Sequence, residues 1–223
     1  MNKSQVTRRR FMLLAGGTVG ATALACGGLA TVGTRQPKIE FVKESYQGAM
    51  NTQNKILVAY ASQCGSTGQV AQTIGQTLAD AGATVDVRPV QDVSDLGGYR
   101  AVVVGSAIRR GKWLRAASTF VETHQSALSR LPTAYFTVCM ALHQDTPENR
   151  SKATAYLEPV RQIVKPIEEG FFAGKMNYDT LALVDRLVIT SMFKLPEGDW
   201  RDWRAIQTWA QALEARFALR GWR

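Results

Sequence analysis

The strongest constraint on the fold is an alternation of apolar strands and amphipathic helices that begins at Lys55. The segment Lys55–Ala61 is an almost continuous apolar run, which is typical of a parallel strand buried on both faces. From Gly68 to Ala81 apolar residues recur every three or four positions, and Gly82 follows. This spacing predicts a helix that ends at the glycine, because a residue without a Cβ readily adopts the left-handed turn that closes a helix.

The same alternation continues to the end of the chain. Further strands are predicted at residues 84–88, 101–105, 134–142 and 170–174, and further helices at 114–128, 148–165 and 202–219. Parallel strands joined by right-handed helical crossovers form a sheet that is covered on both faces. We therefore expect an α/β fold with a doubly wound, five-stranded parallel sheet of order 2-1-3-4-5, and a ligand site at the carboxyl ends of the strands.

One segment before the last helix departs from this alternation. Between Lys175 and Trp200 the chain contains an apolar stretch, residues 181–193, that is helical in pattern and has little polar surface. We expect a helical insert here. Its apolar face either covers the core or contacts a quinone or a bilayer, and the sequence leaves both alternatives open.

Length and charge narrow the classes of protein. The 223 residues, 45% of them hydrophobic and 9% aromatic, suffice for one packed domain and exclude a disordered chain. The 27 Lys and Arg residues outnumber the 18 Asp and Glu residues, but five of the basic residues and no acidic residue lie in the first 35 positions. Residues 36–223 therefore carry 22 positive and 18 negative charges, a balance of +4. A nucleic acid partner is not expected, since such proteins present a strongly basic face.

Residues 1–35 are typical of an export signal. Arg8 and Arg9 are followed, one residue later, by Phe11, and the 24 residues from Phe11 to Thr34 carry no charge and are rich in Gly and Ala. This layout resembles a twin-arginine signal peptide. The resemblance implies export in the folded state, often around a cofactor that is loaded in the cytoplasm.

Cys26 allows three fates for this segment. Its thiol is a lipidation candidate, because Ala23-Leu24-Ala25-Cys26 is a loose lipobox. The same residues also form an Ala-x-Ala cleavage site, and the uncharged stretch could instead remain as an uncut anchor. Two of the three alternatives leave the protein on a membrane, so we expect membrane association on the extracytoplasmic face.

Residues 36–54 are polar and are expected to form a linker of about 19 residues before the domain at 55–223.

A short loop directly after the first strand has the composition of a phosphate site. Its residues are Ser62, Gln63, Cys64, Gly65, Ser66 and Thr67. Backbone N–H groups, the positive end of the following helix and the hydroxyl groups all favour a phosphate dianion, and Gly65 allows close approach of the backbone. No Lys follows the glycine, which excludes a Walker loop, and the Gly-x-Gly-x-x-Gly motif of dinucleotide sites is absent.

The loop resembles the FMN phosphate loop of flavodoxins, with Cys64 where that family has its middle Thr. Other matching segments are Tyr99–Trp113, Phe120-Val121, Leu131-Pro132, Asp185-Arg186, Trp203, Ile206, Trp209 and Ala210. Together they resemble the flavodoxin-type, menaquinone-dependent protoporphyrinogen IX dehydrogenases over residues 55–219. The resemblance implies a flavodoxin-like fold, bound FMN and an inserted segment before the last helix.

The resemblance also implies three segments at the flavin. The loop 62–67 would hold the phosphate, residues 106–111 would form the first loop against the isoalloxazine, and residues 140–143 would begin the second. Beyond the phosphate loop, the implied cofactor-binding residues are Ser106, Ala107, Ile108, Arg109, Arg110, Gly111, Met140, Ala141, Leu142 and His143. Trp113 either stacks on the ring or packs in the core, and His143 either reaches the flavin edge or is structural.

The expected function is an FMN-dependent oxidoreductase that passes electrons to a quinone-like acceptor. Arg109, Arg110 and Lys112 would stabilise an anionic reduced flavin or a carboxylate substrate. The chemistry would take place on the flavin, and no catalytic side chain, metal site or oligomeric state is predicted. The export signal leaves the substrate open, because haem synthesis is cytoplasmic. The alternative is an exported electron carrier without turnover of a small substrate, although soluble flavodoxin shuttles are acidic and residues 36–223 carry +4.

Overall fold

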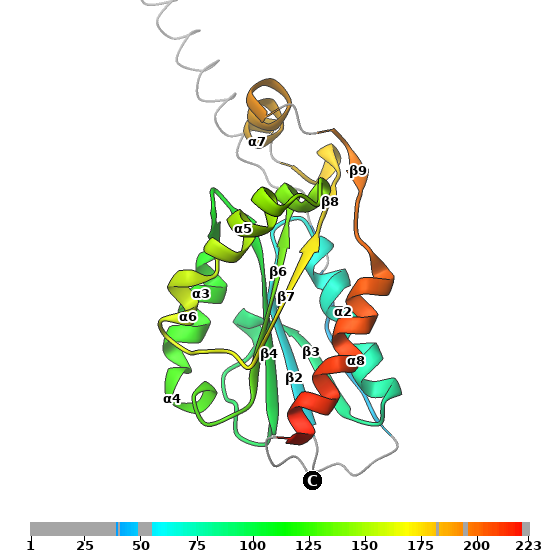
Figure 1. The fold of residues 1–223 in the computed structure, drawn as a ribbon, viewed down its shortest axis with the longest axis vertical. Coiled ribbons are helices and arrows are strands. Elements are labelled where there is room, and N and C mark those ends of the chain that lie inside the picture. Colours follow the sequence, from blue (N-terminus) through cyan, green and yellow to red (C-terminus); the bar gives the residue numbers. More distant parts are fainter. Residues whose placement is uncertain (1–38, 40, 49–54, 182, 194–195, 220–223) are drawn as a thin grey trace, which may run out of the picture. The chain divides into compact units, whose positions relative to one another are not determined.

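The computed structural model describes residues 39, 41–48, 55–181, 183–193 and 196–219 (Figure 1). The chain divides into two compact units. One unit, which we call the body, comprises Ile39–Met176 and Glu197–Arg223. The other contains Asn177–Pro196, which we call the insert. The twin-arginine motif and Cys26 lie outside the described residues, so the expectations about them stay predictions.

The body is built on a sheet whose five central strands are parallel. Their order across the sheet is β3 (Thr84–Pro89), β2 (Lys55–Ala61), β4 (Ala101–Arg109), β6 (Thr133–Cys139) and β7 (Glu168–Ala173). In chain order this is 2-1-3-4-5, which confirms the predicted topology. Two short antiparallel strands extend the sheet. The strand β1 (Glu44–Tyr46) pairs with β3, and the strand β5 (Lys112–Trp113) pairs with the end of β4.

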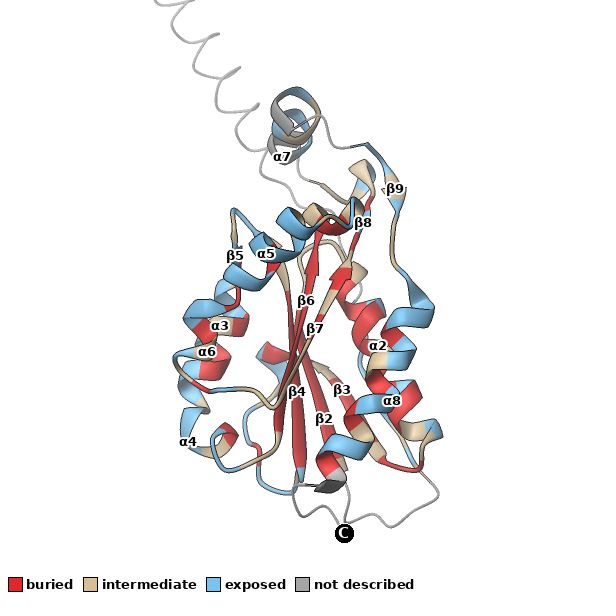
Figure 2. Cartoon of the chain, viewed as in Figure 1, coloured by how far each residue is buried: buried red, intermediate tan, exposed pale blue. Residues whose placement is uncertain are grey.

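Helices cover both faces of this sheet (Figures 1 and 2). One face carries α2 (Ser66–Asp80) and α8 (Trp203–Leu219), and the other carries α3 (Arg115–Thr123), α4 (Gln125–Leu128), α5 (Pro147–Ala155) and α6 (Glu158–Arg161). Alternate side chains of β2 enter opposite cores: Ile56 and Val58 pack with α2 and α8, whereas Leu57 and Ala59 pack with helices of the other face. All four are fully buried, which explains why this strand has no polar face.

Four predicted elements have clearly different bounds in the structure. The strand predicted at 101–105 continues to Arg109. The helix predicted at 148–165 is divided into α5 and α6, because Pro159 lacks an N–H group and stands in the first turn of a new helix. The helix predicted at 114–128 is also divided, into α3 and α4. The strand predicted at 134–142 is shorter, since a 3₁₀ turn, η2 (Met140–His143), follows β6.

The insert is helical, as predicted. It contains a 3₁₀ turn, η3 (Tyr178–Thr180), a short helix, α7 (Leu183–Val188), and a π-helical turn, η4 (Ile189–Phe193). In the body, the segments on either side of the insert pair as two antiparallel strands, β8 (Lys175–Met176) and β9 (Gly198–Asp199). The chain therefore leaves the body and returns to it at one place.

The prediction that residues 36–54 form a linker is wrong for Glu44–Tyr46. This segment forms β1, which pairs in antiparallel register with the middle of β3. Polar contacts hold it: Ser45 Oγ donates to Asp86 Oδ1 at 2.7 Å, and Arg88 Nη1 donates to the carbonyl of Glu44 at 2.5 Å. A polar strand of three residues has no hydrophobic periodicity, so the sequence pattern did not reveal it.

Asp86 is the centre of this network. Besides the Ser45 hydroxyl, its carboxylate binds Lys55 Nζ at 2.7 Å and accepts a hydrogen bond from Tyr99 Oη at 2.7 Å. Burial alone would raise the pKa of Asp86, but these donors outweigh burial and bring the pKa below its ordinary value. One buried carboxylate thus joins β1, the start of β2 and the loop before β4 to β3.

We expect Asp86→Asn to lower the free energy of unfolding at neutral pH by about 2 kcal/mol, because hydrogen bonds to a charged group are weakened. The native pKa lies below the unfolded one, so the stabilisation is present above about pH 4 and is lost as the pH falls through the native pKa. Urea unfolding followed by tryptophan fluorescence should show a difference that shrinks at about pH 3. The surface variant Asp80→Asn is the control, with an expected change below about 0.5 kcal/mol. An equal loss at both pH values would contradict a role for the Asp86 charge.

Candidate functional site

Three chain segments meet at the carboxyl edge of the body, which we define as the edge at which β2, β4 and β6 end (the upper end of the sheet in Figure 1). The loop 62–65 follows β2, a turn joins β4 to β5, and η2 follows β6. Adjacent parallel strands end at the same edge, so these segments are neighbours. They are the three segments that the sequence resemblance implied at the flavin.

The loop between β2 and α2 has the geometry of an anion site. Gly65 adopts a left-handed conformation with a φ of 86°, and its N–H donates to Ser62 Oγ at 3.0 Å. Among the described residues, no side chain caps the N-terminus of α2. The first N–H groups of such a helix and the positive end of its dipole favour an anion.

The Thr67 hydroxyl is the group in this loop that a ligand would satisfy. Thr67 is fully buried in the first turn of α2, and its Oγ1 has no hydrogen-bond partner in the part of the chain that the structure describes. Buried hydroxyl groups without a partner are rare, because each costs about 1–3 kcal/mol. A phosphate oxygen would accept this hydrogen bond, so the loop fits the phosphate group of FMN. Cys64, in the same loop, is half-buried and is not joined to Cys139 by a disulfide.

The predicted first flavin loop is the end of β4 and a tight hairpin. The two residues of β5 return along the last two residues of β4. Arg110 and Gly111 form the turn, with φ values of 52° and 73°, as in two-residue hairpins of type I′. The side chains of Arg109, Arg110 and Lys112 are exposed, so the hairpin presents positive charge at the carboxyl edge.

The side chains of Ser106 and Trp113 are buried and form hydrogen bonds within the body. Ser106 is fully buried, and its Oγ donates to the carbonyl of Ala107 at 2.8 Å and accepts from the N–H of Leu114 at 3.0 Å. Trp113 is also buried, and its Nε1 donates to Thr137 Oγ1 at 2.9 Å. Trp113 therefore packs in the core, as one of the two alternatives predicted. Ala107 and its neighbour Ile108 are half-buried, which places them between the core and the surface.

The turn η2 forms the second predicted flavin segment. Cys139 caps this turn, since its Sγ accepts a hydrogen bond from the N–H of Ala141 at 3.4 Å. Burial raises the pKa of the Cys139 thiol. Leu142 is buried in a small apolar cluster and supports the turn from within. Met140, Ala141 and His143 are half-buried and remain accessible at the carboxyl edge.

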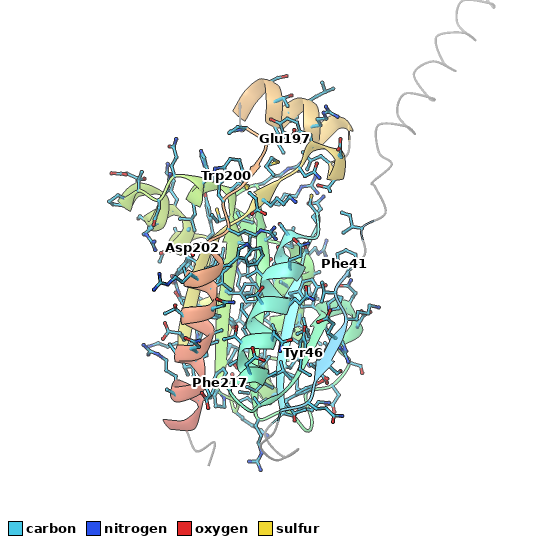
Figure 3. All side chains as sticks on the ribbon, turned by 90° about the vertical axis from the view of Figure 1, so that its right-hand side faces the viewer. Phe41, Tyr46, Glu197, Trp200, Asp202 and Phe217 are labelled. Carbon is cyan, nitrogen blue, oxygen red and sulfur yellow. The ribbon has the colours of Figure 1, made fainter. Side chains whose placement is uncertain are left out.

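His143 is oriented by its own turn and by the chain after the insert. Its Nδ1 lies 2.8 Å from the carbonyl oxygen of Met140, which fits a tautomer with the proton on Nδ1. Its ring packs edge-on against Trp200, with 5.8 Å between ring centroids. The N–H of Trp200 donates to the carbonyl of Gly174 at 3.2 Å. Trp200, labelled in Figure 3, is thus a further residue at the carboxyl edge.

One contact of α2, the helix that follows the predicted phosphate loop, could not be predicted from the sequence. Arg201 Nη1 donates to Gln69 Oε1 of α2 at 2.5 Å, and the guanidinium binds both carboxylate oxygens of Asp199, at 2.7 and 2.5 Å. These hydrogen bonds hold the pKa of Asp199 below its ordinary value. The guanidinium also lies 4.3 Å from the centroid of the Trp203 ring. Residues 69 and 201 are 132 positions apart, and no motif marks either of them.

Comparison with known proteins agrees with this geometry. A family model described as a flavodoxin domain matches residues 57–202. The chain belongs to the flavodoxin-domain family. This confirms the predicted fold and family, and the matched region includes the loop 62–67.

Curated relatives of this flavodoxin domain carry the name of an enzyme. The chain is 24% identical over 172 residues to protoporphyrinogen IX dehydrogenase (quinone) from Escherichia coli (strain K12), which covers 71% of this chain and 94% of the relative. It is 28% identical over 174 residues to a protein of the same name from Leishmania major, which covers 72% and 75%. Among solved structures, oxidised flavodoxin 2 from Bacillus cereus aligns over 73% of this chain and 99% of that chain, with 17% identity and a TM-score of 0.45. The flavodoxin domain is therefore a distant homologue of these dehydrogenases.

We expect Thr67→Val to stabilise the ligand-free protein and to weaken FMN binding. Removing a buried hydroxyl without a partner should raise the free energy of unfolding of the FMN-free protein by about 1 kcal/mol. The affinity for FMN should fall about tenfold, because one hydrogen bond to a charged phosphate is lost. Urea unfolding without FMN and quenching of FMN fluorescence measure the two effects.

Thr77→Val is the matched control for this experiment. Thr77 is also buried on α2, but its hydroxyl donates to the carbonyl of Thr73 at 2.8 Å. Its replacement should leave the FMN affinity unchanged. If Thr67→Val destabilised the ligand-free protein as much as Thr77→Val, the Thr67 hydroxyl would have a partner within the protein.

Proposed function

We propose that this chain is an FMN-dependent oxidoreductase that passes electrons from a reduced small-molecule donor to a quinone. The observation that carries the proposal is the buried Thr67 hydroxyl, which finds no partner among the described residues and lies in the loop where a flavodoxin domain would hold the FMN phosphate. The shared name of the two curated relatives supports both a dehydrogenase activity and a quinone acceptor.

The phosphate loop would bind the cofactor through groups that the structure has already placed. The N–H groups at the start of α2 and the hydroxyls of Ser66 and Thr67 would donate to phosphate oxygens, and Gly65 would keep the left-handed turn that exposes these donors. Bound FMN supplies the ring system that accepts and releases hydride or single electrons. The residues of the loop supply affinity and position, and they take no part in the transfer itself.

The hairpin would set the electrostatic potential beside the flavin ring. Arg110 and Lys112 are exposed at its turn and carry positive charge. Cations stabilise the negative charge that a flavin gains on reduction, so the hairpin would raise the midpoint potential. The same charges would attract a donor that bears carboxylates.

We also propose that the protein is exported by the twin-arginine route and is held on the extracytoplasmic face of a membrane. The support is the sequence of residues 1–35, with Arg8, Arg9 and the uncharged stretch that follows. In the part of the chain that the structure describes, no helix is long and apolar enough to cross a bilayer. The insert exposes Leu187 and Val188 to 58% and 37%, and such side chains suit contact with a quinone or a bilayer surface.

The spectrum of the purified full chain tests the cofactor. We expect bands at about 375 and 450 nm that are bleached by a reductant, as for protein-bound flavin. Protoporphyrinogen should then bleach them without oxygen, and a water-soluble menaquinone analogue should restore them over many cycles. A protein without these bands after reconstitution with FMN would overturn the proposal. Bleaching only by a protein reductant would show an electron carrier instead of an enzyme.

Arg110→Gly tests the contribution of the hairpin to the flavin potential. We expect the midpoint potential of bound FMN to fall by tens of millivolts, because one positive charge is removed while glycine keeps the positive φ of the turn. Spectroelectrochemical titration measures the shift. Arg130→Gly, at an exposed position before the amino end of β6, removes a charge far from the loops and should leave the potential unchanged. Equal shifts in the two variants would show that only net charge matters.

A further inference from the structure

The chain that precedes β1 runs to the carboxyl edge of the body. Because β1 is antiparallel to β3, the residues before Glu44 lie toward the carboxyl end of β3. Two contacts fix this course: the carbonyl of Val42 accepts a hydrogen bond from Tyr60 Oη at 3.0 Å, and Lys43 Nζ lies 2.8 Å from Asp92, just after β3. Burial raises the pKa of Tyr60 to about 12, so its hydroxyl stays protonated and donates.

The first described residue, Ile39, lies against the phosphate loop. A Cβ on Gly65 would come within 3.2 Å of Ile39 Cγ2. Figure 3 shows the same course, since Phe41 lies nearer than Tyr46 to the end of the body that carries Trp200. The chain upstream of Ile39 therefore joins the body beside the predicted FMN phosphate.

This arm, which we define as residues 39–46, is fixed to the body. Besides the contacts of Asp86, Glu44 Oε1 accepts a hydrogen bond from Gln72 Nε2 of α2 at 2.8 Å. Val42 and Tyr46 pack against the core beneath α2 and α8. The polar segment 36–54 is thus not free to act as a spacer, because its middle belongs to the sheet.

The remaining spacer is short. The uncharged stretch ends at Thr34, and five residue steps separate Thr34 from Ile39. Five steps span at most about 18 Å when fully extended, and thirteen steps from a lipid on Cys26 span at most about 45 Å. The amino edge of the sheet is the edge at which β2, β4 and β6 begin. It lies farther from Ile39 than the carboxyl edge does, by the length of a strand, which is about 23 Å for seven residues. An uncut anchor that ends at Thr34 therefore keeps the carboxyl edge closer to the membrane than the amino edge, because its reach of about 18 Å is shorter than the strand.

Charge at this edge suits an anionic surface. The hairpin carries Arg110 and Lys112, and Lys175 is exposed directly after β7. Basic residues are attracted to anionic lipid headgroups by about 1 kcal/mol each near the surface. The insert, whose described residues include the exposed Leu187 and Val188, joins the body at this same edge through β8 and β9.

We infer that the carboxyl edge of the body faces an anionic lipid surface and is held there by the short chain before Ile39. The inference rests on the membrane anchoring proposed above, in the form of an uncut anchor, and is independent of the flavin chemistry. Its functional consequence is that the flavin site opens toward the bilayer, the phase into which a hydrophobic quinone partitions. The quinone would then approach the carboxyl edge from the bilayer, and the reduced donor would approach the same edge from the aqueous phase.

Acetylation of native lysines tests this orientation without a substitution. The full chain would be reconstituted in vesicles of phosphatidylcholine and phosphatidylglycerol, isolated by flotation, and labelled with an acetylating reagent whose sites are read by mass spectrometry. Lys112 and Lys175 mark the carboxyl edge, and Lys165, exposed before β7, marks the amino edge. We expect acetylation of Lys112 and Lys175 to be at least threefold slower on vesicles than in detergent, and that of Lys165 to be unchanged.

A variant with twenty Gly and Ser residues inserted between Arg35 and Gln36 is the matched control. It should float with the vesicles but lose most of the protection, because the tether no longer limits the distance. Equal protection of all three lysines, protection of Lys165 alone, or a full chain that does not float would overturn the inference. Flavin absorbance of the same sample separates the two proposals, since protection without flavin contradicts only the oxidoreductase, and flavin without protection contradicts only the orientation.

Discussion

The burial of β2 on both faces is the constraint on which the rest of the body depends. Leu57 and Val58 have no contact with water, so the backbone of this strand must pair with β3 and β4, and no charged side chain follows Lys55 along it. The strand therefore contributes to the candidate site through the loop at its end. Because β2, β4 and β6 are parallel, the phosphate loop, the hairpin and η2 are assembled at one edge although they are distant in the sequence.

Two buried polar side chains show how a structural group differs from a binding group. The carboxylate of Asp86 is surrounded by donors from three other segments, and it holds the sheet together at neutral pH. The hydroxyl of Thr67 is as deeply buried but has no partner among the described residues. Native proteins satisfy most of their buried polar groups, so the first site is complete in itself, whereas the second leaves a donor that a ligand would satisfy.

The sequence was sufficient for the parts of the fold that depend on periodicity and composition. The central strands, their order and the phosphate loop all followed from apolar runs and a Gly/Ser/Thr cluster. The rest depends on distant contacts: β1 is held by polar groups, Arg201 meets Gln69 across 132 positions, and β4 continues far enough to turn Ser106 inward. Ser106 was expected at the flavin because of the family resemblance, and only the structure shows that its hydroxyl already has partners within the hairpin.

The arm has a consequence for folding and solubility. It covers the outer edge of β3 with a strand of only three residues, whose own outer edge is short and carries charge at Glu44 and at the preceding Lys43. Short charged edge strands discourage pairing between molecules, whereas a bare central strand invites aggregation. A domain that began at Lys55 would uncover Val85, Asp86 and Val87 at the edge of β3 and leave Asp86 without Ser45. A cut upstream of the arm would leave this edge of the sheet covered, whereas a cut after it would not.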